Sequence, residues 1–252
     1  MTQQEIGYAV FTVSSIVLFA LTIKIVRSGR KVKVSDSAIL LFILVGLIYD
    51  NFMLGFGSQF FQEGTTFLVM SVPRYLMHGL FTPLLIVQVA LSCDRLNVPG
   101  YRSRGVLTMW GATAFIAIFI GLVADVGLEL GFTTIGGVWS YKPISELGPP
   151  LAEIITVVSM IAMGIQLTRF VRWPWVLVAS SVMFYIAAFY NSNGVLANLG
   201  EQILLSGCVA TGAYAVKAAT KEREAKRLEA ISRKRGSKVA DSQTEELVPS
   251  ES

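Results

Sequence analysis

The chain has 252 residues, of which 53% are hydrophobic and only 15% are charged. Its mean hydropathy of +0.60 places it among integral membrane proteins and argues against a soluble domain or a disordered chain. The net charge of +4 does not indicate nucleic-acid binding, because the cations gather at the ends of apolar segments and in the tail. The two cysteines, Cys93 and Cys208, lie in apolar segments and match neither a disulfide framework nor a metal-binding spacing.

Seven apolar segments follow one another along the chain, each about long enough to cross a bilayer as a helix. They cover residues 6–27, 38–57, 68–93, 105–126, 148–170, 173–191 and 196–217. Lysine and arginine gather in the first, third and fifth connections and after the last segment, whereas Lys142 is the only cation in the other connections. Since cytoplasmic loops are enriched in these cations, the sequence predicts an all-α, seven-helix, multi-pass membrane bundle with its N-terminus outside and its C-terminus in the cytoplasm.

Two regions outside the apolar segments have their own patterns. The connection 127–147 contains TTIGGVWSY, which predicts a short hairpin or lid over the bundle mouth with Gly136 and Gly137 as its turn. Residues 1–217 form the predicted transmembrane domain, and residues 218–252 form a cytoplasmic extension. From Ala218 to about Lys238 this extension is rich in Lys, Arg, Glu and Ala, which predicts a helix that either binds anionic lipid headgroups or only anchors the last crossing. Residues 237–252 are polar and predicted to be disordered.

Polar residues at membrane depth predict a site. Arg74, His78 and Thr82 are spaced four apart and therefore share one helix face. Ionisable groups inside a membrane normally face the bundle interior or a wet cavity, so we expect a polar chamber in the outer half of the bundle. The predicted members are Tyr49, Asp50, Asn51, Arg74, His78, Thr82 and Glu201, with Phe184 and Tyr185 as a candidate apolar wall. No metal site is predicted, because His78 is the only histidine.

Each of these polar residues also has a purely structural interpretation. Asp50 would neutralise Arg74 in a pair that only ties two helices together. His78 would be a buried imidazole, hydrogen-bonded to a backbone carbonyl or to Tyr49. Three further acids, Asp125, Glu153 and Glu201, would end their helices at the level of the lipid headgroups.

A resemblance to a known family rests on three short runs. Arg74-Tyr75 and the following Leu80-Phe81-Thr82-Pro83-Leu84-Leu85 resemble the third helix of microbial (type 1) rhodopsins, which carries Arg-Tyr and Thr-Pro-Leu-Leu at the same spacing. The runs 53–57 (MLGFG) and 198–201 (NLGE) are similar to the end of their second helix and the start of their seventh. The resemblance implies a seven-helix bundle with the N-terminus outside.

The chain departs from this family at the positions that would handle retinal. The position of the retinal lysine in the last helix falls at or beside Ala213, within residues 211–213, where there is no lysine, and Lys217 lies one turn further on. The carboxylate counterion is matched by Met77, the cytoplasmic proton donor by Gln88, and the second acid by Val209. Lysine and carboxylates are missing together, which argues against retinal and against light-driven pumping, and no other cofactor is predicted. A retinal protein that uses Lys217 is the alternative.

Two classes of function follow from these patterns. In the first, an opsin-like, non-photoactive protein uses its outer chamber to bind a small or lipidic ligand or to sense protons, with Arg74 as an anion anchor and His78 as the titrating group. In the second, a membrane-embedded enzyme acts on a lipid with Asp50 and His78 as an acid/base pair. The sequence holds no nucleophile elbow and no phosphate-binding loop, so it favours the non-enzymatic interpretation.

Overall fold

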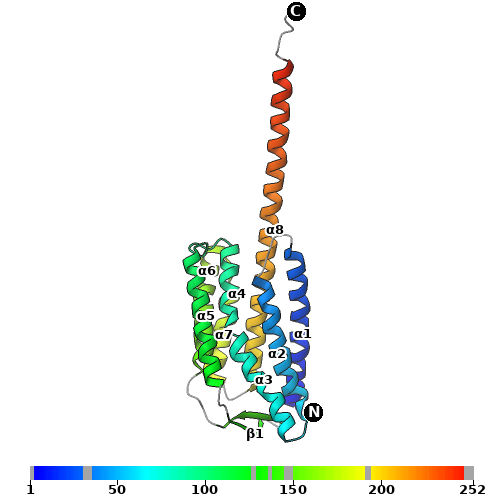
Figure 1. The fold of residues 1–252 in the computed structure, drawn as a ribbon, viewed down its shortest axis with the longest axis vertical. Helices are drawn as coiled ribbons and strands as arrows, with labels where there is room; N and C mark the ends of the chain where they lie inside the picture. The colour runs from blue at the N-terminus through cyan, green and yellow to red at the C-terminus, as the bar shows by residue number, and fades with distance from the viewer. Residues whose placement is uncertain are drawn as a thin grey trace, which may run out of the picture.

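The computed structural model describes residues 3–30, 36–125, 129–135, 138–144, 150–190 and 194–246. Within these ranges the chain forms a helical bundle with a two-stranded hairpin at one end (Figure 1). The helices are α1 (Gln3–Gly29), α2 (Asp36–Phe60), α3 (Thr65–Phe81), α4 (Leu84–Arg95), α5 (Arg104–Asp125), α6 (Leu151–Val171), α7 (Trp175–Tyr190) and α8 (Gly194–Glu246), and the strands are β1 (Leu130–Ile135) and β2 (Val138–Pro143).

The length and surface of the helices are those of a multi-pass membrane protein. Among the described residues, six helical stretches are long and apolar enough to cross a membrane, when α3 and α4 are taken as one broken stretch, and α7 is a shorter apolar helix. Large apolar side chains such as Val13, Phe115 and Phe119 are exposed on the outside of the bundle. A soluble protein would bury such side chains, so the predicted class, an all-α membrane bundle, is confirmed.

The helices pack around a dense apolar core. Fully buried side chains from α2, α4 and α6, including Leu44, Ile86 and Met160, form this core with residues of α7 and α8. A Cβ atom at Gly164 of α6 would lie 2.6 Å from the backbone nitrogen of Leu177 in α7. Only glycine permits this close approach, which brings α7 against α6.

A proline divides the segment predicted at 68–93 into two helices. The amide of Thr82 still donates to the carbonyl of His78 at 3.1 Å. Pro83 has no N–H to donate, and the amide of Leu85 donates to the carbonyl of Thr82, three residues back, instead of continuing the α-helical pattern. Pro83 therefore separates α3 from α4 at the level of the cavity described below.

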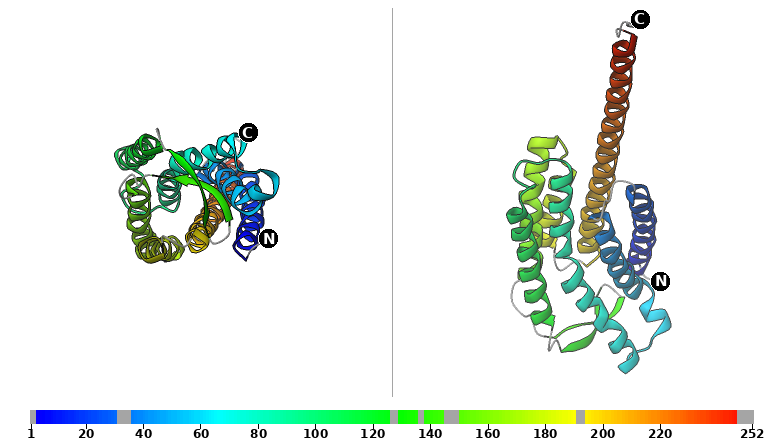
Figure 2. Two further views of the ribbon diagram at one scale, coloured as in Figure 1. Left: turned by 90° about the horizontal axis from the view of Figure 1, so that it is seen from below. Right: turned by 45° about the horizontal axis from the view of Figure 1, so that its top comes forward.

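The hairpin lies across the end of the bundle (Figure 2). Its strands are antiparallel, with Leu130 opposite Pro143 and Ile135 opposite Val138, which confirms the predicted hairpin. The predicted turn at residues 136–137 lies outside the described residues. Tyr141 of β2 docks the hairpin, because its ring meets Phe67 of α3 edge-on with centroids 5.5 Å apart.

Helix α8 continues far beyond the other helices (Figure 1). The helix predicted from residue 218 is present as a direct continuation of the last apolar segment, and Glu222 and Lys226 form an ion pair of 2.6 Å on it. It continues past Ser237, where disorder was predicted, to Glu246. No proline interrupts this stretch, and Gly236 alone costs only about 1 kcal/mol of helix stability relative to alanine, so the Ala-, Glu- and Lys-rich sequence remains helical.

Candidate functional site

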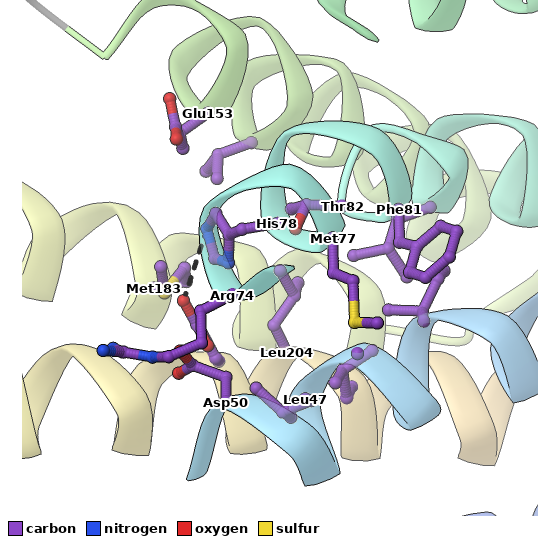
Figure 3. Close-up of a pocket in the computed structure, with 16 residues that line it drawn as sticks. Leu47, Asp50, Arg74, Met77, His78, Phe81, Thr82, Glu153, Met183 and Leu204 are labelled. Carbon is purple, nitrogen blue, oxygen red and sulfur yellow. Dashed lines mark hydrogen bonds and ion pairs between the residues drawn. The ribbon is translucent and has the colours of Figure 1, made fainter. Parts of the chain in front are cut away.

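A cavity of about 50 Å³ lies where α2, α3, α6, α7 and α8 meet (Figure 3). Its polar lining consists of Asp50, Arg74, His78, Thr82, Glu153 and Glu201. Apolar side chains close the rest, among them Leu47, Met77, Phe81, Met183 and Leu204. The structure therefore brings five of the seven predicted polar members together around one space.

Asp50 and Arg74 form a close ion pair at the edge of this cavity. The Arg74 Nε donates to Asp50 Oδ1 at 2.7 Å, and the Arg74 side chain is only 9% exposed. Arg74 Nη1 donates to Ser140 Oγ of β2 at 3.0 Å, so the guanidinium also holds the hairpin. Figure 3 shows the terminal nitrogens of Arg74 pointing away from His78. The geometry agrees with the alternative in which Asp50 neutralises Arg74 and ties α2 to α3.

His78 faces a different carboxylate. Its Nε2 lies 3.6 Å from Glu201 Oε1, which joins α3 to α8 (Figure 3). Three more carboxylates, those of Asp50, Asp125 and Glu153, lie within electrostatic reach of the imidazole. His78 is thus the one imidazole in a group of acids contributed by α2, α5, α6 and α8.

Asp125 approaches α3 closely at the end of α5. A Cβ atom at Gly79 would lie 2.7 Å from Asp125 Oδ2 and 3.4 Å from the backbone of Gly121. Glycine at position 79 therefore lets α5 lie directly against α3, beside His78. This contact also shows how deep Gly79 lies in the bundle, because it places Gly79 level with the last turn of α5.

Two predicted members lie elsewhere. The Tyr49 hydroxyl donates to the carbonyl of Met70 at 2.7 Å, and its ring packs with the cluster under the hairpin. Asn51 is fully buried, and its Nδ2 donates to the carbonyl of Leu47 at 2.9 Å. Tyr49 joins α2 to α3, whereas the bond of Asn51 lies within α2, and neither side chain lines the cavity.

The prediction of an aromatic wall from α7 is wrong for this cavity. Phe184 and Tyr185 are 45% and 54% exposed on the outside of the bundle. The face of α7 that turns inward carries Met183 and Ile186, which pack against Gly200 of α8. Apart from Ser180 and Ser181, which fall on different faces, α7 consists of apolar and aromatic residues, so its sequence did not show which face turns inward.

Sequence reasoning also missed members of the site. Glu153 was not among the predicted members of the chamber and was expected to end its helix at the level of the lipid headgroups, yet it lines the cavity. Ser140 and Lys142 of β2 were not connected with Arg74. Burial and the nearby Arg74 guanidinium lower the pKa of Lys142. The alternation of side chains along a strand, which puts Ser140 and Lys142 on one face, was the available signal.

The positions matched to the retinal-handling residues are not arranged around a chromophore. Ala213 and Lys217 are both exposed. At a helical rise of about 1.5 Å per residue, Lys217 lies about 18 Å along α8 from Leu205, the last residue of α8 at the cavity. Met77 lines the cavity, whereas Gln88 is buried in α4 and donates to Ser92 Oγ at 3.2 Å.

Comparison with known proteins found no relative of this chain: no family model matches it, and no curated protein matches it.

The site is therefore interpreted from the dimensions of its cavity. A cavity of about 50 Å³ holds a few water molecules, since one water needs about 10–15 Å³. Pockets for drug-sized ligands measure about 300–1,000 Å³. Fold and site thus define a helical membrane bundle with a small acidic chamber toward one end.

Proposed function

We propose that this chain is an opsin-like, non-photoactive membrane protein that senses protons in its outer chamber and transmits their binding through α8 to the cytoplasmic side. The observation that carries the proposal is the contact of His78 with Glu201. The two side chains meet at the cavity, come from α3 and α8, and both change charge when they bind or release a proton.

The proposed topology is seven crossings with the N-terminus outside. The cations Arg95, Arg104 and Arg172 end or begin helices at the same end of the bundle as the α8 extension, which supports a cytoplasmic position for that end. As a helix of 16 residues, α7 spans only about 24 Å. Trp175 and Tyr190 at its two ends are of the type that anchors helices at both membrane interfaces, which supports a seventh crossing in a locally thinned bilayer.

The size and charge of the chamber favour protons over a lipidic ligand. The lining supplies three carboxylates, from Asp50, Glu153 and Glu201, against one guanidinium and one imidazole. Since Arg74 is paired with Asp50, the remaining acids surround His78 with an excess of negative charge. Such an environment takes up protons when the outside becomes acidic.

The inner half of the bundle supports a sensor and not a conduit. Fully buried apolar residues, including Leu40, Leu44 and Met163, fill the interior between the chamber and the cytoplasmic end. Transmission would instead follow α8, which is one continuous helix from Glu201 to the extension. The acid/base pair Asp50–His78 that an enzyme would need has less support, because Asp50 bonds Arg74 and His78 faces Glu201.

A tryptophan that contacts α8 can report on the proposed response of this helix. Trp173, between α6 and α7, stacks on Tyr214 of α8 at a centroid distance of 4.3 Å and donates from Nε1 to Thr211 Oγ1 at 2.9 Å. A variant that keeps Trp173 and replaces the other three tryptophans by phenylalanine would report on α8 through its fluorescence. We expect the emission of the purified full-length variant to change cooperatively between about pH 5 and 8, where an imidazole titrates.

His78→Gln and Glu201→Gln should each abolish this transition, and Glu222→Gln, on the exposed part of α8, should preserve it. A flat fluorescence profile in the Trp173-only variant, or a transition that survives both chamber substitutions, refutes proton sensing at this site. A visible absorption band that forms with all-trans retinal and disappears in Lys217→Ala would refute the non-photoactive assignment.

A further inference from the structure

We propose that Arg74, Ser140 and Lys142 form a phosphate-binding site at the outer end of the bundle, between α3 and the hairpin. The phosphate would come from a phospholipid headgroup or from free phosphate. This site is separate from the contact of His78 with Glu201, and the inference does not rest on proton sensing.

Two observations bring the donors of this site together: the hydrogen bond from Arg74 to Ser140, and the positions of Ser140 and Lys142 two residues apart on β2. Arg74 uses Nε for Asp50 and Nη1 for Ser140, which brings the outer edge of the guanidinium to β2. Residues two apart on a strand point to the same face and lie about 6.6 Å apart at Cα. Lys142 therefore extends from the same face as Ser140, beside Arg74.

The strand that carries these donors is held in place from both sides. Between Ser140 and Lys142, the carbonyl of Tyr141 accepts a hydrogen bond from the Tyr75 hydroxyl at 2.7 Å. The Tyr141 hydroxyl accepts the amide N–H of Gly64 at 3.1 Å, where α3 begins. An anion would thus meet donors that are already positioned, which lowers the cost of binding it.

Within the described ranges, the charges leave one positive group uncompensated, that of Lys142. Asp50 neutralises Arg74, and no acidic side chain in the described part of the chain forms an ion pair with Lys142. Lys142 is half-buried next to a guanidinium, a position in which its ammonium is costly without an anion. One excess positive charge matches the single negative charge of a phosphodiester, and the guanidinium and ammonium donors match its acceptor oxygens. The Ser140 hydroxyl is buried between Arg74 Nη1, from which it accepts, and the Tyr141 carbonyl, to which it donates, so Ser140 positions the guanidinium.

The depth of the site agrees with a lipid phosphate. Gly79 lies beside the last turn of α5, where that helix ends at Asp125. Arg74 is five residues further toward the start of α3, which is about 7.5 Å beyond the end of α5. This is the level at which α5 has left the hydrocarbon and the headgroups begin.

The test uses the full-length protein in detergent and native mass spectrometry with added phosphatidylglycerol. We expect one lipid to bind with high affinity, and Lys142→Met to weaken this binding by about tenfold or more, as for the loss of a hydrogen bond to a charged group. Ser140→Ala should weaken it less. Lys221→Met, which removes an exposed cation from α8, and Glu201→Gln, which disables the proposed proton sensor, should both bind as the wild type does.

Inorganic phosphate at constant ionic strength separates the two sources. If it displaces the lipid or stabilises the protein in a Lys142-dependent way, the site takes free phosphate. If only the phospholipid binds in that way, the site takes a headgroup. Equal binding by the wild type and Lys142→Met, or no binding of either compound by the wild type, overturns the proposal.

Discussion

Replacing Asp50 by asparagine should destabilise the protein strongly, because it leaves Arg74 buried with an uncompensated charge. The two groups are 2.7 Å apart, and the side chains of Arg74 and Asp50 are 9% and 18% exposed. Unit charges about 4 Å apart attract by about 4 kcal/mol at an effective dielectric constant of about 20, and loss of one partner of a buried pair costs about 3–5 kcal/mol. Since Ser140 still accepts from Arg74, we expect about 3 kcal/mol.

Two buried cysteines make this loss measurable. Cys93 and Cys208 are fully buried, so a thiol-reactive fluorescent dye will label them only when the bundle unfolds. For a chain of this size, about 3 kcal/mol corresponds to a decrease in Tm of about 6–12 °C. The double variant Asp50→Asn, Arg74→Gln should recover part of this decrease, because it removes the unpaired charge together with its partner.

The control is an ion pair of similar length on the surface. Glu222 and Lys226 are 2.6 Å apart, but both are exposed on the α8 extension, so Glu222→Gln should leave Tm unchanged. If Asp50→Asn unfolds at the wild-type temperature, the buried pair does not stabilise the bundle and the reasoning is refuted.

Three further predictions concern packing, the hairpin and charge. Gly164→Ala should lower Tm, because the added Cβ atom would lie 2.6 Å from the backbone of Leu177. Gly111→Ala is the control and should not lower Tm, because no atom lies within 4 Å of the Cβ atom added there. Equal effects of the two substitutions would refute the close contact between α6 and α7. Tyr141→Phe removes the hydroxyl that binds Gly64 and should speed amide hydrogen exchange in β2; unchanged exchange would argue against docking by that hydroxyl. In detergent free of phosphate and phospholipid, the lowered pKa of Lys142 means that the unfolded chain binds more protons between that pKa and the ordinary value. Stability should therefore rise with pH through this interval, and Lys142→Met should remove that part of the rise.

The sequence predicted the helices well because hydrophobic length alone decides where a chain can cross a bilayer. It also placed Arg74, His78 and Thr82 on one face, since helical periodicity does not depend on the rest of the fold. It could not decide which acid faces His78. That choice depends on where α8 lies relative to α3, which follows from the packing of the whole bundle, for example from the close contact of α8 with α7 at Gly200.

The two faces of α7 could not be told apart for a related reason. In water, an exposed face must be polar, but a lipid-facing surface is as apolar as the core. Phe184 and Met183 are therefore equivalent by hydropathy, although one is outside and the other lines the cavity. The hairpin was predictable from its turn residues, whereas the hydrogen bond from Arg74 to Ser140 needed the three-dimensional arrangement.

In the opsin-like frame that we propose, the titratable group on α3 lies at position 78 and not at the counterion position, which Met77 occupies. One residue along a helix rotates a side chain by about 100°. Met77 therefore packs toward Gly46 of α2, while His78 turns to Glu201 of α8. A carboxylate at position 77 would pair with a positive charge held inside the bundle, whereas an imidazole at position 78 forms a charge pair with Glu201 only when it is protonated. In the proposed sensor, this shift by one residue replaces a fixed charge pair by a pH-dependent contact between α3 and α8, and α8 would respond to the binding of a proton.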